Sequence, residues 1–203
     1  MTAGTTGTGP HLLDLGPTAR QVALLAGKVG DEQLAGPTPC PEYRVRNLLG
    51  HLLHLSTAFR DAGRKDLGPT TGTNPGAYLP DIDDAGAWRA ELPERLAELA
   101  AVWGDPAAWE GMTQAGGVTF PASEAGRVAL NEITVHGWDL ARATGQPYAP
   151  ATEALESSLV MLAPSAHDRP EGSLFGEAVA VPEDSPLLDR VIALSGRNPA
   201  WTP

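Results

Sequence analysis

The sequence predicts an all-α protein, a four-helix bundle with a short helical extension at its C-terminal end and with one short strand pair as a further option. Four long segments repeat apolar residues every three or four positions, which is the period of an amphipathic helix. Glycine- and proline-rich stretches separate these segments, and two shorter helical patterns follow the fourth. A length of 203 residues fits one domain, so we expect residues 1–203 to form a single unit.

The first two helices are expected over residues 18–29 and 45–62. Gly30 ends the first, and the proline-rich loop GPTPCPEY separates it from the second. Each has an apolar stripe along one face, formed by Val22, Leu25 and Val29 in the first and by Val45, Leu48, Leu52, Leu55 and Phe59 in the second. Residues 1–10 are small and polar, and we expect a disordered leader there.

The third and fourth helices are expected over residues 85–103 and 122–144. Gly145 follows the fourth in the position of a C-terminal cap, where a left-handed backbone favours glycine. The stretches 68–80 and 104–121 are expected to be loops, because they are rich in glycine, proline and threonine.

The extension, residues 151–203, is expected to pack on the bundle as shorter pieces. A helix is expected over 152–162, and the alternating run 178–181 is compatible with a short strand. A last helix begins after the Ser-Pro pair at 185–186 and ends at Gly196. Long loops allow helices that are not consecutive in sequence to be neighbours, so we assume no simple up-and-down order.

Composition excludes several classes of protein. Fourteen Lys and Arg stand against 25 Asp and Glu, and a net charge of −11 argues against a nucleic-acid-binding face. No apolar run approaches the roughly 18 residues of a transmembrane helix, and residues 1–9 lack the pattern of a signal peptide. A single cysteine, Cys40, excludes an internal disulfide and is typical of a reducing compartment. We therefore expect a cytoplasmic protein without membrane or nucleic-acid partners. A homodimer through an exposed apolar helix face is compatible with the sequence, but no residue demands it.

The fourth helix has ionisable residues on its apolar face. At about 100° per residue, Glu132, His136 and Asp139 fall inside the arc that its apolar residues occupy. An ionised carboxylate in a core is costly unless it is paired or bound to a cation. Glu132 and His136 are four residues apart, so their side chains are neighbours and can offer two ligands to one metal ion.

The second helix offers His51 and His54 as a third ligand. His51 lies about 80° from the centre of the apolar stripe and His54 about 140° from it, towards solvent, so we choose His51. His51, Glu132 and His136 would form a two-histidine, one-carboxylate set with open positions, as in catalytic zinc sites. The same set suits Fe(II). A hydrogen-bonded core pair of Glu132 and His136 without metal is the alternative.

Four further residues have two interpretations each. Asp139 is expected to orient a ligand histidine or to pair with Arg142. Arg142 and Asp139 are the candidate catalytic residues, and Arg142 has the second option of binding a substrate carboxylate. Arg197 either points towards the site or caps the helix before it. Cys40 is expected to be a buried small residue, with a reactive thiol as the alternative.

Two segments carry a family resemblance. Residues 37–55, PTPCPEYRVRNLLGHLLHL, and 131–147, NEITVHGWDLARATGQP, resemble the second- and fourth-helix signatures of the actinobacterial mycothiol-dependent maleylpyruvate isomerase N-terminal domain family, part of the DinB-like metal-binding superfamily. The resemblance places metal ligands on three residues here: His51, Glu132 and His136. The motifs GVTFPA and LSGRNPAW extend it, and Asn47 departs from it where the family usually has Asp.

The resemblance implies a DinB-like bundle that holds a divalent metal, usually zinc, and a low-molecular-weight thiol such as mycothiol as cofactor or co-substrate. The predicted function is a metal-dependent transferase or isomerase that joins the thiol to a small electrophilic substrate. The tail is shorter than the separate C-terminal domain of the isomerase itself, so its substrate does not carry over. A metal-dependent hydrolase and a non-catalytic accessory protein that binds a metal or small ligand are the alternatives.

Overall fold

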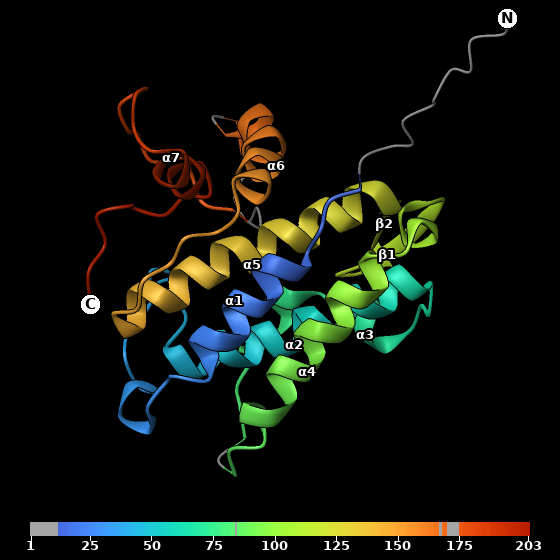
Figure 1. The fold of residues 1–203 in the computed structure, drawn as a ribbon, viewed down its shortest axis with the longest axis horizontal. Helices are drawn as coiled ribbons and strands as arrows, with labels where there is room; N and C mark the ends of the chain where they lie inside the picture. The colour runs from blue at the N-terminus through green and yellow to red at the C-terminus, as the bar shows by residue number, and fades with distance from the viewer. Residues whose placement is uncertain (1–11, 84, 167, 170–174) are drawn as a thin grey trace, which may run out of the picture.

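Four long helices form the body of the protein. The structure, a computed structural model, describes residues 12–83, 85–166, 168–169 and 175–203, so the expected leader 1–10 lies outside the described residues. The long helices are α1 (Gly16–Ala26), α2 (Val45–Arg64), α4 (Trp88–Trp103) and α5 (Ala122–Thr144). The predicted all-α bundle is confirmed (Figure 1), and the predicted bounds of the fourth helix match α5 residue for residue.

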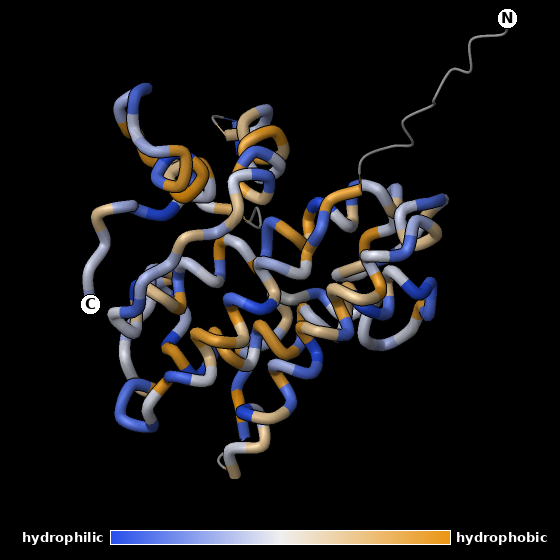
Figure 2. The backbone as a smooth tube through the Cα atoms, viewed as in Figure 1, coloured by the Kyte–Doolittle hydropathy of each residue, from blue (hydrophilic) through white to orange (hydrophobic). Residues whose placement is uncertain are grey.

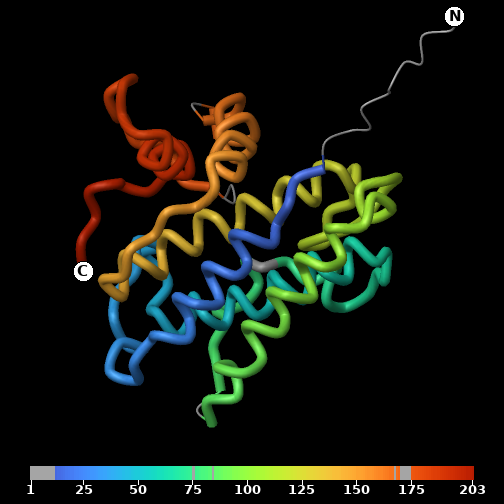
Figure 3. The backbone as a smooth tube through the Cα atoms, viewed as in Figure 1, coloured from blue at the N-terminus to red at the C-terminus, as the bar shows by residue number. Residues whose placement is uncertain are grey.

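The helices of the bundle are not neighbours in sequence order. Helix α4 packs against both α1 and α2, and α5 packs against the same two helices. Helices α1 and α2 therefore occupy opposite corners of the bundle. Figure 3 shows the long connection, including the short 3₁₀ helix η1 (Asp31–Gln33), that carries the chain from one to the other.

The apolar faces of all four helices meet in one core. Figure 2 shows the apolar positions along the long helices alternating with polar ones at the helical period. Trp103 is fully buried, and its indole N–H donates to the Phe59 carbonyl at 2.9 Å, so its polar atom is satisfied. The other large side chains that the core buries completely include Leu48, Leu49, Leu52, Leu92, Leu96, Leu99, Leu130, Ile133 and Leu140.

The start of α2 is tied to the segment before α4 by Asn47. Its Oδ1 accepts from the Arg44 backbone N–H at 3.1 Å, and its Nδ2 donates to the Pro80 carbonyl at 2.8 Å. A Cβ at Gly50 would lie 2.6 Å from the Asp81 carbonyl carbon, so this segment crosses α2 in direct backbone contact. An ionised Asp could not make both contacts, because it accepts hydrogen bonds and donates none.

The two expected loops contain more regular structure than their composition predicts. The first contains α3 (Pro69–Gly72) and the 3₁₀ turn η2 (Pro75–Ala77). The second contains the 3₁₀ helix η3 (Pro106–Trp109) and the antiparallel strands β1 (Met112–Ala115) and β2 (Val118–Pro121).

The pair of strands is a hairpin around Gly116 and Gly117. Both glycines have positive φ, 60° and 80°, which a two-residue hairpin turn of mirror-image type requires. The short strand pair that the sequence allowed is confirmed, but it lies here, where a loop was predicted, because the Gly-Gly pair was assigned to a connection and not to a turn between strands. The strand considered at 178–181 does not form, and Val179 instead donates its N–H to the Ala193 carbonyl.

The extension adds α6 (Thr152–Leu162), which adjoins α5 in Figure 1, and α7 (Leu187–Leu194), which lies next to α6. Helix α6 packs on α5, and α7 packs on α6. They share a small second core with one residue of α5; its buried members are Val135, Leu155, Leu162 and Val191. Among the described residues, none of the helices has the length and apolar character needed to cross a lipid bilayer.

We expect Asn47→Asp to lower the free energy of unfolding by about 2 kcal/mol near pH 7, because a buried carboxylate would face the Pro80 carbonyl without a donor. The pKa of the introduced carboxyl would be higher in the folded than in the unfolded chain. The penalty is therefore full above the folded-state pKa and shrinks towards pH 4, where a protonated carboxyl can donate. Urea unfolding of variant and wild type at both pH values measures this difference.

Asn47→Ala is the matched control, since it removes both hydrogen bonds and introduces no titrating group. Its loss of stability relative to wild type should be the same at the two pH values. Equal unfolding free energies for Asn47→Asp and the wild type at neutral pH would contradict the role assigned to the amide.

Candidate metal centre

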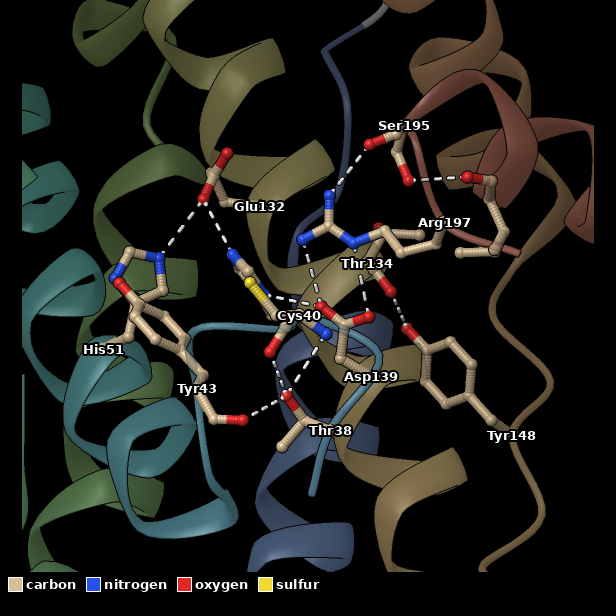
Figure 4. A network of polar contacts seen from close by, with 12 residues as sticks. Thr38, Cys40, Tyr43, His51, Glu132, Thr134, Asp139, Tyr148, Ser195 and Arg197 are labelled. Atoms are coloured by element: carbon tan, nitrogen blue, oxygen red, sulfur yellow. Dashed lines mark hydrogen bonds and ion pairs between the residues drawn. The ribbon is translucent and has the colours of Figure 1, made fainter. Parts of the chain in front are cut away.

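Three ionisable side chains from two helices meet at one point. His51 comes from α2, and Glu132 and His136 come from α5. Figure 4 shows His51 and Glu132 turned towards each other. Glu132 Oε2 lies 3.6 Å from His51 Nε2 and 3.4 Å from His136 Nε2. One ligand atom from each residue lies within 4.8 Å of the other two, and within the described part of the chain no other group of three His, Cys, Asp or Glu does so.

The helical pattern explains why these side chains converge. Glu132 and His136 are one turn apart on α5, and His51 lies on the flank of α2 that faces it, because α2 and α5 pack against each other. The rings of His51 and His136 are 4.6 Å apart, edge to face. The side chains are 13%, 15% and 8% exposed in the order His51, Glu132, His136, so the cluster lies just beneath the surface.

The distances are compatible with ligands that share a divalent ion. Separations of 3.4 and 3.6 Å exceed the roughly 2.7–3.2 Å of ordinary hydrogen bonds. Two ligand atoms at about 2.0–2.2 Å from a tetrahedral zinc ion lie roughly 3.3–3.6 Å apart. Two imidazole nitrogens and a carboxylate oxygen suit such an ion and leave a coordination position for another ligand.

The far nitrogen of His136 is held by Asp139. His136 Nδ1 lies 2.9 Å from Asp139 Oδ2, and Asp139 is completely buried. An ionised carboxylate can only accept, so the proton of this hydrogen bond belongs to Nδ1. The lone pair of a neutral His136 ring then lies on Nε2, which faces Glu132 and His51.

Asp139 pairs with Arg197 and not with Arg142. Arg197 Nη2 lies 3.1 Å from Asp139 Oδ2, and its Nε lies 3.3 Å from Oδ1. The Arg142 guanidinium instead donates to the carbonyls of Trp201 and Pro199. The pair expected between Asp139 and Arg142 is thus corrected, because Arg142 points from α5 to the C-terminal tail and Asp139 points into the interior.

The charges of the cluster are set by competing effects. Burial raises the pKa of Glu132, but the neighbouring His136 and His51 outweigh it and hold this pKa well below the usual value. For His136, burial lowers the pKa, but Asp139 and Glu132 outweigh burial and raise this pKa above its ordinary value. For His51, burial dominates and its pKa lies below the ordinary value.

Positive charge is therefore favoured at His136, between the carboxylates of Glu132 and Asp139. Burial raises the pKa of Asp139, but Arg197 and His136 outweigh it and keep the carboxyl ionised. With Glu132 also ionised, His136 Nε2 is a place where either a proton or a metal ion is stabilised by its surroundings.

The loop before α2 covers one side of the cluster. The Thr38 hydroxyl links two parts of this loop. It accepts from the Cys40 N–H at 3.2 Å and lies 2.7 Å from the Tyr43 carbonyl oxygen. The centre of the Tyr43 ring lies 5.5 Å from the centre of the His51 ring. Burial raises the pKa of the Tyr43 phenol to about 12. Sequence reasoning did not single out Thr38 or Tyr43; the signal was their place in the proline-rich loop directly before the ligand-bearing helix.

Cys40 lies in the same loop and is partly buried. Burial raises the pKa of its thiol to about 11, with Arg197 opposing the shift and Asp139 adding to it. The thiol is thus protonated at neutral pH, as expected of a small packing residue. His54, which was not chosen as a ligand, is exposed and bonds to Tyr78 Oη at 2.6 Å.

The turn of α5 that holds His136 is supported from behind at Gly137. A Cβ at this position would lie 2.7 Å from Tyr148 Oη and 2.9 Å from Val22 Cγ2 of α1. The Tyr148 hydroxyl donates to the Thr134 carbonyl at 2.9 Å. Only glycine leaves room for this close approach behind the ligand-bearing turn.

Comparisons with known proteins agree with the fold and the sequence motifs. The family model described as mycothiol maleylpyruvate isomerase N-terminal domain matches residues 15–141, which include all three cluster residues. Uncharacterized protein Rv0738 of Mycobacterium tuberculosis is 28% identical over 194 residues, covering 87% of this chain and 91% of that protein. Uncharacterized protein Rv0036c of the same species is 28% identical over 167 residues, covering 73% of this chain and 62% of that protein.

Solved structures give the same architecture. The crystal structure of the mycothiol-dependent maleylpyruvate isomerase is similar with a TM-score of 0.51 at 16% identity, covering 71% of this chain. A mutant of that isomerase gives a TM-score of 0.53 at 15% identity and covers 78%. This chain spans 65% and 70% of the lengths of those two chains, so the likeness concerns the shared fold.

Cys40 is expected to react slowly with iodoacetamide near pH 8, since with a pKa of about 11 only roughly a thousandth of its thiol is ionised there. The rate should rise about tenfold per pH unit until it approaches that pKa. Intact-protein mass spectrometry at several pH values measures the rate. A cysteine-containing peptide is the control, and its rate should level off above about pH 8.5. Alkylation of Cys40 as fast as the peptide near pH 8 would contradict the assignment.

Proposed function

The chain belongs to the mycothiol maleylpyruvate isomerase N-terminal domain family, and from that premise we propose that it is a divalent-metal-dependent enzyme acting through a low-molecular-weight thiol. The thiol, mycothiol by the family's description, would be transferred to a small electrophilic substrate or would catalyse its isomerisation. The observation that carries the proposal is the convergence of His51 Nε2, a Glu132 oxygen and His136 Nε2 at separations suited to one ion.

The donor set determines which chemistry is available. A divalent ion held by these three residues, zinc by the preference of two imidazoles and a carboxylate, would supply Lewis acidity and lower the pKa of a thiol that it binds. Glu132 contributes one negative charge and the histidines contribute none when neutral. The centre therefore keeps a net positive charge that favours an anionic thiolate.

The residues around the donors orient them and limit access. Asp139 holds the proton on His136 Nδ1, which keeps the Nε2 lone pair directed at the centre. Tyr43 and the loop that carries it cover one side, next to the His51 ring. The three side chains keep 8–15% of their surface exposed, and a thiol and a substrate would approach them from that exposed side.

The reacting thiol is proposed to be external to the chain. Cys40 is the single cysteine, and burial raises its pKa to about 11, so it remains protonated at neutral pH. A thiol that approaches from solvent can be ionised at the centre, whereas the Cys40 thiol is held within its own loop. This difference favours a thiol-dependent enzyme over one with its own cysteine nucleophile.

Metal retention tests the proposed ligands. After loading with zinc and dialysis, the wild type is expected to retain about one ion per chain, and Glu132→Gln and His136→Ala are expected to bind zinc at least about 10-fold more weakly. Elemental analysis measures the content. His54→Ala is the matched control, because His54 is an exposed histidine on the same helix, three residues from His51. Equal zinc in wild type and His136→Ala would reject the ligand set.

Thiol dependence tests the proposed reaction. The zinc-loaded protein, mixed with mycothiol and a small α,β-unsaturated acid, is expected to form the thiol adduct or the geometric isomer faster than the same mixture without protein. Mass spectrometry and proton NMR measure the two products, and His136→Ala is expected to show the uncatalysed rate. Ester cleavage without thiol would favour a hydrolase. No turnover, with a thiol-induced rise in Tm, would favour a binding protein.

A further inference from the structure

The buried carboxylate of Asp139 connects two side chains from distant parts of the chain. On one side it accepts from His136 Nδ1 at 2.9 Å. On the other it faces the fork of Arg197, with Nη2 3.1 Å from Oδ2 and Nε 3.3 Å from Oδ1 (Figure 4). Arg197 is 58 residues further along the chain, and its side chain is 10% exposed. The carboxylate thus lies between the cluster and the C-terminal extension.

The two contacts of Arg197 determine how the carboxylate is turned. A guanidinium that bonds both oxygens fixes the plane of a carboxylate as well as its position. Because Oδ2 is also the atom that meets His136, the orientation of the carboxylate sets the orientation of the imidazole. Arg142 of α5 is the other arginine near Asp139 in the sequence, and its guanidinium donates to the carbonyls of Trp201 and Pro199.

The end of α7 delivers Arg197 to this place. Gly196 has a φ of 84°, and the Arg197 N–H donates back to the Ile192 carbonyl, so the chain reverses directly after the helix. Arg197 Nη1 also donates to the Ser195 carbonyl at 2.9 Å, which holds the guanidinium against its own turn. A Cβ at Gly196 would lie 2.8 Å from the Gly176 backbone, so the turn is closely packed.

We propose that Arg197 is a positioning residue of the metal centre, through which the C-terminal extension raises the affinity for the ion by holding Asp139 and, through Asp139, His136. The inference rests on the proposed metal ligands. Within the described residues, the hydrogen bonds and the ion pair of Arg197 reach Asp139 and none of the three proposed ligands, so the positioning effect proposed here passes through Asp139. The extension is therefore part of the centre, although none of the three ligands lies in it.

A double-mutant cycle on zinc affinity tests this inference. Zinc dissociation constants are measured by competition with a chromophoric chelator for wild type, Arg197→Met, Asp139→Asn and the double variant. Arg197→Met is expected to weaken zinc binding roughly 10-fold, at the lower end of the effect of groups that hold a metal ligand. In the Asp139→Asn background the same change should have an effect of less than about twofold, because the carboxylate it orients is gone.

Two further variants separate orientation from loss of structure. Arg142→Met removes contacts between α5 and the same tail without touching Asp139, and its zinc affinity should stay within about twofold of wild type. Arg197→Lys keeps the charge and should recover part of the lost affinity. It replaces Arg197→Met in the cycle if the methionine variant does not fold, as judged by circular dichroism.

The outcomes are distinct. Absence of zinc binding by the wild type would overturn the ligand set and with it the proposed function. Tight binding by the wild type together with unchanged binding by the Arg197 variants would overturn only this inference. Additive losses in the cycle would also overturn it, because they would show that Arg197 acts independently of Asp139.

Discussion

Two ionised carboxylates on the buried face of α5 are the constraint on which the rest of this structure depends. Neither Glu132 nor Asp139 can lie among apolar helices unless positive charge or hydrogen-bond donors come to it. His136 lies between them on the same helix and contacts both. His51 approaches Glu132 from α2, and Arg197 approaches Asp139 from the extension. Residues from three parts of the chain, α2, α5 and the turn after α7, thus converge on one negatively charged stripe.

The part of this arrangement that is local in sequence could be predicted. A polar residue inside an apolar arc is visible from helical phase alone, and the phase difference between His51 and His54 was enough to choose the side chain that faces α5. The predicted bounds of both α5 and α6 match the structure, and Gly145 marks the end of α5. These features depend on spacings of three or four residues, which the sequence states directly.

The partner of Asp139 could not be predicted, because the pairing depends on how the extension folds back. Arg142 is one turn away and was the natural candidate from spacing, yet it faces the tail. One of the two options for Arg197 was that it points towards the site, but its pairing with Asp139 depends on the turn after α7, which no local pattern reveals. It also lies beyond residues 15–141, the interval that the family model matches. The hairpin at Gly116 and Gly117 was not located from the sequence for a different reason. Its strands have four residues each, which is too short to show a clear alternation of apolar and polar residues.

The close approach at Gly137 has a consequence for how an ion would enter. Tyr148 and α1 press against the back of the helical turn that holds His136, so this turn has little freedom to shift. Because the turn that carries His136 is already fixed, it would lose little conformational entropy if an ion bound there. Any rearrangement on binding would then involve the ion's hydration shell and the loop that carries Tyr43. A methyl group added at Gly137 would clash with Tyr148 and Val22 and force this region to shift, so a residue outside the cluster constrains the position of the His136 imidazole.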